Sequence, residues 1–125
     1  MPQLKVAHQS WPLAKAFTIS RGSRTSSEVV IVEIHDGDIV GRAECMPYAR
    51  YDETVEGVIA DINRFAEPIA GGLNREALQE ALPAGAARNA LDCAFWDLEA
   101  KLRGATVWQL AGLDVPVPLV TAYTL

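Results

Sequence analysis

The stretch VVIVEIHDGDIVGRAEC, from Val29 to Cys45, holds two runs rich in β-branched residues on either side of Asp36-Gly37-Asp38. β-Branched side chains fit the pleated surface of a sheet, and Asp-Gly between two such runs is a strong signal for a tight hairpin. The stretch therefore predicts two antiparallel strands, Val29–Ile34 and Ile39–Cys45, and makes an antiparallel sheet the first part of the fold.

Shorter runs upstream extend this predicted sheet. Leu4–Ser10 and Ala16–Ser20 are mostly apolar or β-tolerant, and Trp11-Pro12 separates them. Arg21–Ser27 is polar and rich in turn-forming residues, so we expect a loop there. The first third of the chain therefore predicts an antiparallel sheet of about three strands. A second loop is expected over Met46–Asp52.

Beyond Asp52 the apolar residues recur at the spacing of a helix instead of a strand. Glu53 and Glu56 are expected in the first turn of the first helix, where the helix dipole favours negative charge. Strands followed by helices predict an α+β fold, a three-stranded antiparallel meander followed by a helical bundle. The predicted helices are one with the stripe Val55, Val58, Ile59, Ile62, Phe65 and Ala66, one over Arg75–Leu82 capped by Asn74, one from Gly85 to Arg103 ended by Gly104, and a turn from Thr106 to Leu110.

The composition restricts the classes of function. The chain has 125 residues, of which 50% are hydrophobic and 22% charged, as is usual for one globular domain. Its formal net charge of −5 argues against a nucleic-acid partner, because such a protein needs a basic surface. No apolar run approaches the ~20 residues that span a bilayer, and Met1–Ser10 lacks the apolar core of a secretory signal. We therefore expect no membrane partner and a cytoplasmic protein.

The residues that could bind a metal are poorly spaced for that role. Cys45 and Cys93 form neither a CxxC pair nor a Cys/His cluster, so we expect two reduced thiols, with Cys93 packed in a core. Asp92 and Asp97 would lie about 140° apart on a helix, which places them on different faces. The spacing therefore gives no support for a metal site.

Four segments follow one another in the order and spacing of a known family. Ile19–Arg24 reads ISRGSR, a strand that runs into an Arg-Gly-Ser-Arg loop, and Pro83–Leu98 reads PAGAARNALDCAFWDL. Gly41–Glu53 matches the pattern Gly-x-x-Glu-Cys-x-Pro-Tyr-x-Arg-Tyr-x-Glu, and Thr121–Thr124 reads TAYT. Over nearly its whole length the chain resembles the N-terminal capping domain of the enolase superfamily, and within it the dipeptide epimerases.

The resemblance implies a division of the chain. Residues 1–114 would be the capping domain, and residues 115–125 would be a linker and the first strand of a (β/α) barrel that the 125-residue chain lacks. In this family the barrel carries a Lys-x-Lys base, three acidic ligands for one Mg²⁺ and a second lysine. Together they move the α-proton of the Glu residue in L-Ala-D/L-Glu dipeptides from one face to the other, and the metal stabilises the enolate.

The catalytic groups of that barrel are not found in this sequence. Lys5, Lys15 and Lys101 are isolated, and there is no set of acidic residues on successive barrel strands. We therefore expect no catalytic residue and no metal ligand in this chain, which would be inactive alone. The resemblance implies that it acts with its own barrel domain, with Mg²⁺ and with a dipeptide substrate.

The resemblance also assigns substrate contacts to two loops of the cap, Ser20–Ser26 and Met46–Asp52. In the family these loops close over the substrate and recognise its side chain. For Ala-Glu that side chain is a carboxylate, so an arginine with its fork of donors is expected. The alternatives are loop arginines in solvent and tyrosines that only pack. The candidate substrate-binding residues are Arg24 first, Arg21 second, and then Tyr48 and Tyr51.

Two other interpretations stay open. The same cap could belong to another enolase-superfamily enzyme, namely an N-acylamino acid racemase, an o-succinylbenzoate synthase or a muconate lactonising enzyme. Alternatively, the chain is a non-catalytic domain that associates with itself through the apolar surface that a cap buries against its barrel. Strand swapping over Val117–Leu125 is one route to such a homo-oligomer.

Overall fold

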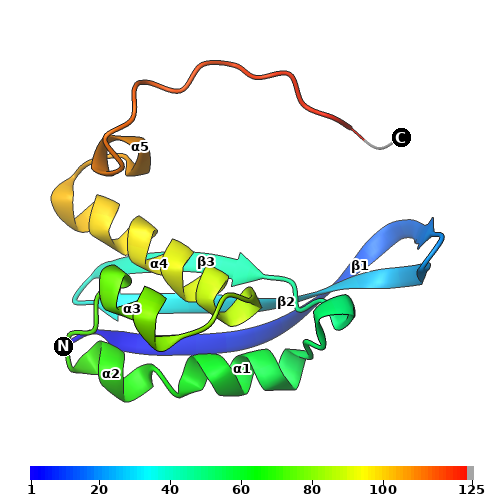
Figure 1. Ribbon diagram of the computed structural model, residues 1–125, viewed down its shortest axis with the longest axis horizontal. Coiled ribbons are helices and arrows are strands. Elements are labelled where there is room, and N and C mark those ends of the chain that lie inside the picture. The colour runs from blue at the N-terminus through cyan, green and yellow to red at the C-terminus, as the bar shows by residue number, and fades with distance from the viewer. Residues whose placement is uncertain (124–125) are drawn as a thin grey trace.

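Three antiparallel strands form a meander in the computed structural model, which describes residues 1–123 of the chain (Figure 1). The strand order is β1-β2-β3, so each strand pairs with the next along the chain. Helices follow the sheet, which confirms the predicted α+β fold. The strands are β1 (Gln3–Ile19), β2 (Gly22–Asp36) and β3 (Ile39–Cys45).

The hairpin predicted between Val29 and Cys45 is present. Asp36 pairs with Ile39, and Gly37 between them has a φ of 57°, in the left-handed region that favours glycine. Because side chains alternate along a strand, every second residue of β2 faces the helices. Those residues are Val30, Val32 and Ile34, each 0% exposed.

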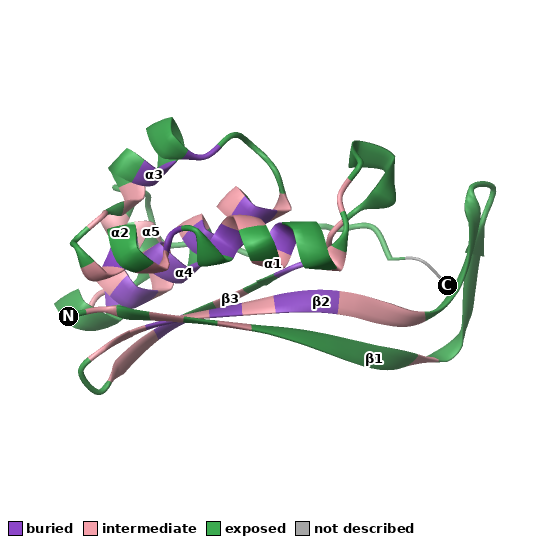
Figure 2. Ribbon diagram, turned by 90° about the horizontal axis from the view of Figure 1, so that it is seen from below, coloured by how far each residue is buried: buried purple, intermediate pink, exposed green. Residues whose placement is uncertain are grey.

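β1 and β2 extend past the end of β3 as a two-stranded arm, residues 9–29 (Figure 2). The predicted loop Arg21–Ser27 is therefore wrong beyond its first residue, because β2 begins at Gly22 and only Ser20-Arg21 forms the turn. Serine and threonine are tolerated in this ribbon since both of its faces meet solvent. The predicted break at Trp11-Pro12 is also absent, because β1 is an edge strand and can accommodate a proline.

Helices cover one face of the sheet, as Figures 1 and 2 show. Two predicted ends are confirmed: the Asn74 side chain accepts a hydrogen bond from the Ala77 N–H at 2.9 Å, and Gly104 ends the long helix with a φ of 61°. The helical elements are η1 (Ala49–Tyr51), α1 (Val55–Asn63), α2 (Ala66–Ala70), α3 (Arg75–Ala81), α4 (Ala86–Arg103) and α5 (Val107–Leu110).

The first predicted helix is divided into two at Phe65. The φ and ψ of Phe65 are −91° and 0°, and its side chain is only 8% exposed, so it turns into the core. Pro68 explains the division, because it lacks the N–H that a continuous helix would need and is tolerated in the first turn of α2. The start of α1 also differs from the prediction: Thr54 is the N-cap, so Glu53 lies outside the helix.

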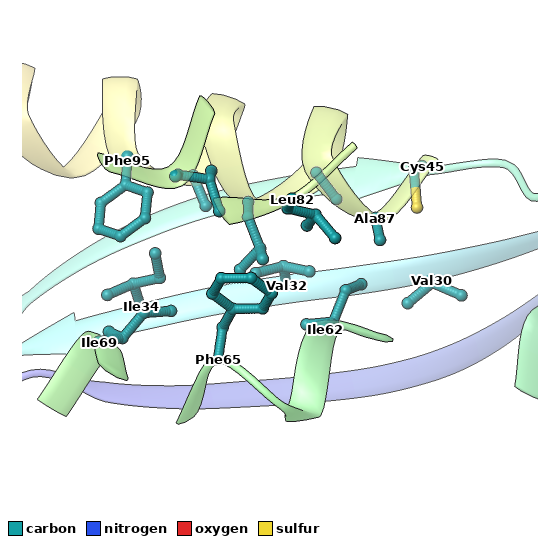
Figure 3. Close-up of a cluster of buried hydrophobic side chains, with 14 of the residues drawn as sticks. Val30, Val32, Ile34, Cys45, Ile62, Phe65, Ile69, Leu82, Ala87 and Phe95 are labelled. Carbon is teal, nitrogen blue, oxygen red and sulfur yellow. The ribbon is translucent and has the colours of Figure 1, made fainter. Parts of the chain in front are cut away.

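The core lies between the sheet and the helices. Figure 3 shows Ile62 and Phe65 beside Val32, and Ile69 beside Ile34 with Phe95 of α4 on its other side. At Gly41 the backbones of β3 and α4 come so close that an added Cβ would lie 2.3 Å from the Ala94 carbonyl oxygen. A glycine is therefore needed at this crossing, since no other residue leaves space for the helix.

The two cysteines differ in burial. Cys45 is 6% exposed within the core, whereas Cys93 is exposed, so the expectation that Cys93 packs in a core is wrong. The physical reason is the position of Cys93 on α4, where Ala90, Leu91 and Ala94 occupy the inward face. Burial, with the negative charges of Glu53 and Glu44, raises the pKa of the Cys45 thiol to about 11, so this thiol stays protonated near neutral pH.

Two side chains of α4 occupy the free edge of β3. The Arg42 N–H donates to Asp97 Oδ2 at 2.7 Å, and Lys101 Nζ donates to the Val40 carbonyl at 2.7 Å and to Asp97 Oδ2 at 2.6 Å. An edge strand exposes backbone groups that can pair with another chain. The Asp97–Lys101 pair therefore fastens α4 to the sheet and satisfies these edge groups at the same time.

Replacing Asp97 with alanine should lower the free energy of unfolding by about 1 kcal/mol, the usual net worth of partly exposed hydrogen bonds to a charge. Partial burial acts to raise the pKa of Asp97, but the bonds from Lys101 and from the Arg42 N–H outweigh it and lower this pKa. Such a carboxylate stabilises the fold above its unfolded pKa of about 3.9, and the contribution is lost as the pH falls through the folded value.

Urea unfolding of the wild type and Asp97→Ala, at about pH 7 and about pH 2, would measure the loss in free energy of unfolding. The difference between the two proteins should shrink at the lower pH. Asp114→Ala, at an exposed position, is the control and should change the stability by less than about 0.5 kcal/mol. A difference for Asp97→Ala that is constant across this range would contradict the role given to the carboxylate.

The segment from Leu113 to Tyr123 lies outside any helix or strand. The barrel strand expected over Thr121–Thr124 is not formed in its described part, because a strand needs a hydrogen-bonded neighbour and this segment lies apart from the sheet (Figure 1). Thr124 and Leu125 lie outside the described residues. Within residues 1–123 no helix has both the length and the apolar character needed to cross a membrane.

Candidate functional site

The tip of the arm carries both predicted substrate-binding arginines. Arg21 lies in the turn and Arg24 on β2, and both are exposed. Arg24 pairs across the ribbon with Phe17, and its guanidinium carbon lies 5.3 Å from the centre of the Phe17 ring. A contact with an aromatic face orients a guanidinium without occupying its N–H donors. Among the described residues, no carboxylate lies within ion-pair distance of Arg24.

The second predicted loop lies at the base of the arm. It follows Cys45, which pairs with Val30 where β3 ends, so both loops belong to the same end of the sheet (Figure 1). The rings of Tyr48 and Tyr51 meet edge to face, with centres 5.5 Å apart and an angle of 63° between their planes. Tyr48 is 41% exposed and Tyr51 69% exposed, so the pair offers an aromatic surface to a ligand.

A cavity of about 270 Å³ separates this loop from the start of α4. The tyrosine pair forms one wall of the cavity, and the first turn of α4 forms another. The other lining residues are Cys45, Met46, Glu53, Gly85, Ala86 and Asn89.

Glu53 joins the loop to the helix. Its Oε2 accepts from the Tyr48 N–H at 3.4 Å, and its Oε1 accepts from the Ala86 N–H at 3.3 Å. The carboxylate therefore serves the N-terminus of α4, where Gly85 has no side chain to cap the helix. The sequence pattern placed Glu53 in the first turn of its own helix, because a contact over 33 residues leaves no local signal.

The structure therefore brings the tyrosines together and places the two arginines on one tip. Within residues 1–123, no hydrogen bond or cation–π contact joins either arginine to either tyrosine. The acidic residues of α4 have structural partners, since Asp92 accepts from Gln79 at 2.8 Å and Asp97 binds the β3 edge. In the part of the chain that the structure describes, no group of three histidine, cysteine or acidic side chains is placed to hold a metal ion.

Known proteins share this sequence and fold. The family model for the mandelate racemase / muconate lactonizing enzyme N-terminal domain matches residues 1–112. The chain is 46% identical to the L-Ala-D/L-Glu epimerase of Escherichia coli (strain K12) over 124 residues, which are 99% of this chain and 39% of that protein. It is 44% identical to an N-acetyl-D-glutamate racemase of Pseudoalteromonas sp over 75 residues, 58% of this chain and 24% of the racemase.

Solved structures agree in fold. An enolase family member from Agrobacterium tumefaciens with homology to dipeptide epimerases, bound to sodium and L-Ala-L-Glu, superposes with a TM-score of 0.93 at 48% identity, over 98% of this chain and 38% of that one. The dipeptide epimerase of Enterococcus faecalis V583, complexed with Mg and L-Leu-L-Tyr, gives 0.75 at 30% identity, over 86% and 33%. The chain thus spans less than half the length of each of these relatives.

Proposed function

Because this chain belongs to the mandelate racemase / muconate lactonizing enzyme N-terminal domain family, we propose that it is the capping and substrate-specificity domain of an L-Ala-D/L-Glu epimerase. Residues 1–114 would form the cap, and residues 115–125 would lead into a (β/α) barrel that carries the chemistry. Support comes from the E. coli epimerase, which is similar to nearly the whole chain over 39% of its own length.

The observation that carries the proposal is the free guanidinium of Arg24 at the arm tip. Phe17 supports it from one side, and its N–H donors are available to a planar anion. The side-chain carboxylate of a Glu residue is such an anion and can accept two parallel hydrogen bonds from arginine. Arg21, four positions from Phe17 along the arm, would add positive charge, and Tyr48 with Tyr51 would form an aromatic wall for the rest of the dipeptide.

In this proposal the cap binds and orients, while the barrel moves the proton. Binding energy from a remote group such as a side-chain carboxylate can hold the α-carbon in a reactive position. Closure of the arm and of the tyrosine loop would exclude water from the reacting centre. Mg²⁺ held by the barrel would supply stabilisation of the enolate, and among residues 1–123 no group of three histidine, cysteine or acidic side chains is placed to bind it.

A racemase of N-acetylglutamate is the second candidate. It is favoured by the similarity to the Pseudoalteromonas racemase over residues that include part of the cap. The same Arg24 would serve, because N-acetylglutamate carries the same side-chain carboxylate as Ala-Glu. The two candidates differ in the group that precedes the Glu residue, which is an alanyl residue in one and an acetyl group in the other.

The test is exchange of the α-proton for deuterium in D₂O with Mg²⁺. The substrates are L-Ala-L-Glu and N-acetyl-L-glutamate, and the proteins are the 125-residue chain and the full product of its gene. We expect the full product to exchange L-Ala-L-Glu faster than N-acetyl-L-glutamate. We expect residues 1–125 alone to exchange neither substrate. Preference for N-acetyl-L-glutamate would favour the racemase, and exchange by the 125-residue chain alone would overturn the assignment of a cap.

A further inference from the structure

Glu28 stands at the base of the arm and contacts both of its strands. Its carboxylate lies 2.5 Å from His8 Nε2, accepts from Ser10 Oγ at 2.5 Å and accepts from Ser26 Oγ at 2.7 Å. We infer that Glu28 is a positioning residue, which fixes the arm and thereby the place of Arg24 over the substrate. This inference rests on the proposed function for the role of Arg24.

Glu28 lies at the end of the hydrophobic core. Val30, two residues along β2 on the same face, is 0% exposed and still pairs with Cys45 of β3. β3 has ended before it reaches Glu28, and the Glu28 side chain is 40% exposed. A two-stranded ribbon in water is only marginally stable without packing. In the arm, the hydrogen bonds of Glu28 therefore hold β1 and β2 together in place of core contacts.

Beyond these hydrogen bonds the register of the ribbon is interrupted. Pro12 pairs with Ser26 and Phe17 pairs with Arg24, so residues 13–16 of β1 face only Thr25 of β2. Such a bulge bends a strand and disrupts its ladder of hydrogen bonds. The last three regular pairs before it are Ser10–Glu28, Trp11–Ser27 and Pro12–Ser26, and the Glu28 carboxylate links the first of them to the third through Ser10 and Ser26. A change at Glu28 is thus expected to move the tip as a unit.

The charge of Glu28 suits this role. Hydrogen bonds from Ser10, Ser26 and His8 lower the pKa of Glu28 to about 2. The group is therefore an ionised carboxylate over the neutral range, with both oxygens available as acceptors. Both serines donate to Oε1 and His8 lies on Oε2, so glutamine could keep an oxygen for the serines and turn its NH₂ group toward His8, whereas alanine removes every acceptor.

Glu28→Ala tests the inference, with Glu33→Ala as the matched control. Glu33 is on the same strand but on the opposite face and away from the arm, and its carboxylate is likewise hydrogen-bonded, to Arg42 and His35, each at 2.8 Å. The first readout is the rate at which trypsin cleaves the full gene product after Lys15, Arg21 and Arg24 of the arm. We expect about fivefold faster cleavage there in Glu28→Ala and no change in Glu33→Ala. Equal rates at these sites in wild type and Glu28→Ala would overturn the inference whatever the activity.

The second readout is epimerisation by the full gene product, with L-Ala-L-Glu and L-Ala-L-Gln as substrates. Glu28→Ala should raise KM for L-Ala-L-Glu by about tenfold with little change in kcat, and change KM for L-Ala-L-Gln much less. In an Arg24→Ala background the same substitution should have no further effect. Equal losses on both substrates, or a loss that persists without Arg24, would show a merely structural role. A wild-type enzyme without epimerase activity would instead contradict the proposed function.

Discussion

Gly41→Ala is expected to destabilise the domain by about 3 kcal/mol or more, because the new methyl group would overlap the helix that covers the sheet. The added Cβ would lie 2.3 Å from the Ala94 carbonyl oxygen, 2.5 Å from Leu98 Cβ and 2.8 Å from the Leu98 nitrogen. Two of these three atoms belong to the backbone of α4, so no side-chain rotation can relieve the overlap. The helix must move away from β3 and lose part of the core.

Urea unfolding followed by circular dichroism measures this effect. Gly71→Ala is the matched control, since Gly71 has a φ of −79° and an added Cβ there would meet its nearest atoms at 3.4 Å. We expect the control to change the stability by less than about 0.5 kcal/mol. An unchanged midpoint in Gly41→Ala would show that α4 does not pack on β3 at this distance.

Features that depend on neighbouring residues could be predicted from the sequence. The turn at Asp36-Gly37, the N-cap at Asn74 and the helix end at Gly104 each follow from a residue and its partners within a few positions. The alternation of Val30, Val32 and Ile34 likewise follows from the period of a strand. Together these local signals were sufficient for the order of elements and for the α+β class.

Features that depend on distant partners could not be found in this way. Residues 22–28 have the composition of a loop, yet they form a strand because β1 provides a partner along their whole length. Neither the contact of Gly41 with α4 nor the hydrogen bond of Glu53 to Ala86 has a local signature. In the candidate site, the motif pointed to Arg24 through family resemblance, whereas the supporting Phe17 became visible only with the register of the arm.

Arg24→Ala in the full gene product should lower kcat/KM for L-Ala-L-Glu by roughly 100-fold, since a hydrogen-bonded charge pair contributes about 1.5–3 kcal/mol. The loss is expected mainly on substrates with a second carboxylate, because the guanidinium has no structural ion pair among the described residues to lose. Turnover of L-Ala-L-Gln, which lacks that carboxylate, should change by less than about twofold.

Arg24→Lys separates charge from geometry. Lysine keeps the positive charge but loses the planar fork and the stacking on Phe17, so an intermediate loss of about tenfold is expected. Arg64→Ala is the control for removal of an exposed arginine: this residue is 70% exposed at the junction of α1 and α2, away from the arm (Figure 1). Two results would contradict recognition of the Glu side chain by the arm tip. One is an equal fall in kcat/KM for both dipeptides in Arg24→Ala, and the other is an unchanged kcat/KM for L-Ala-L-Glu in Arg24→Lys.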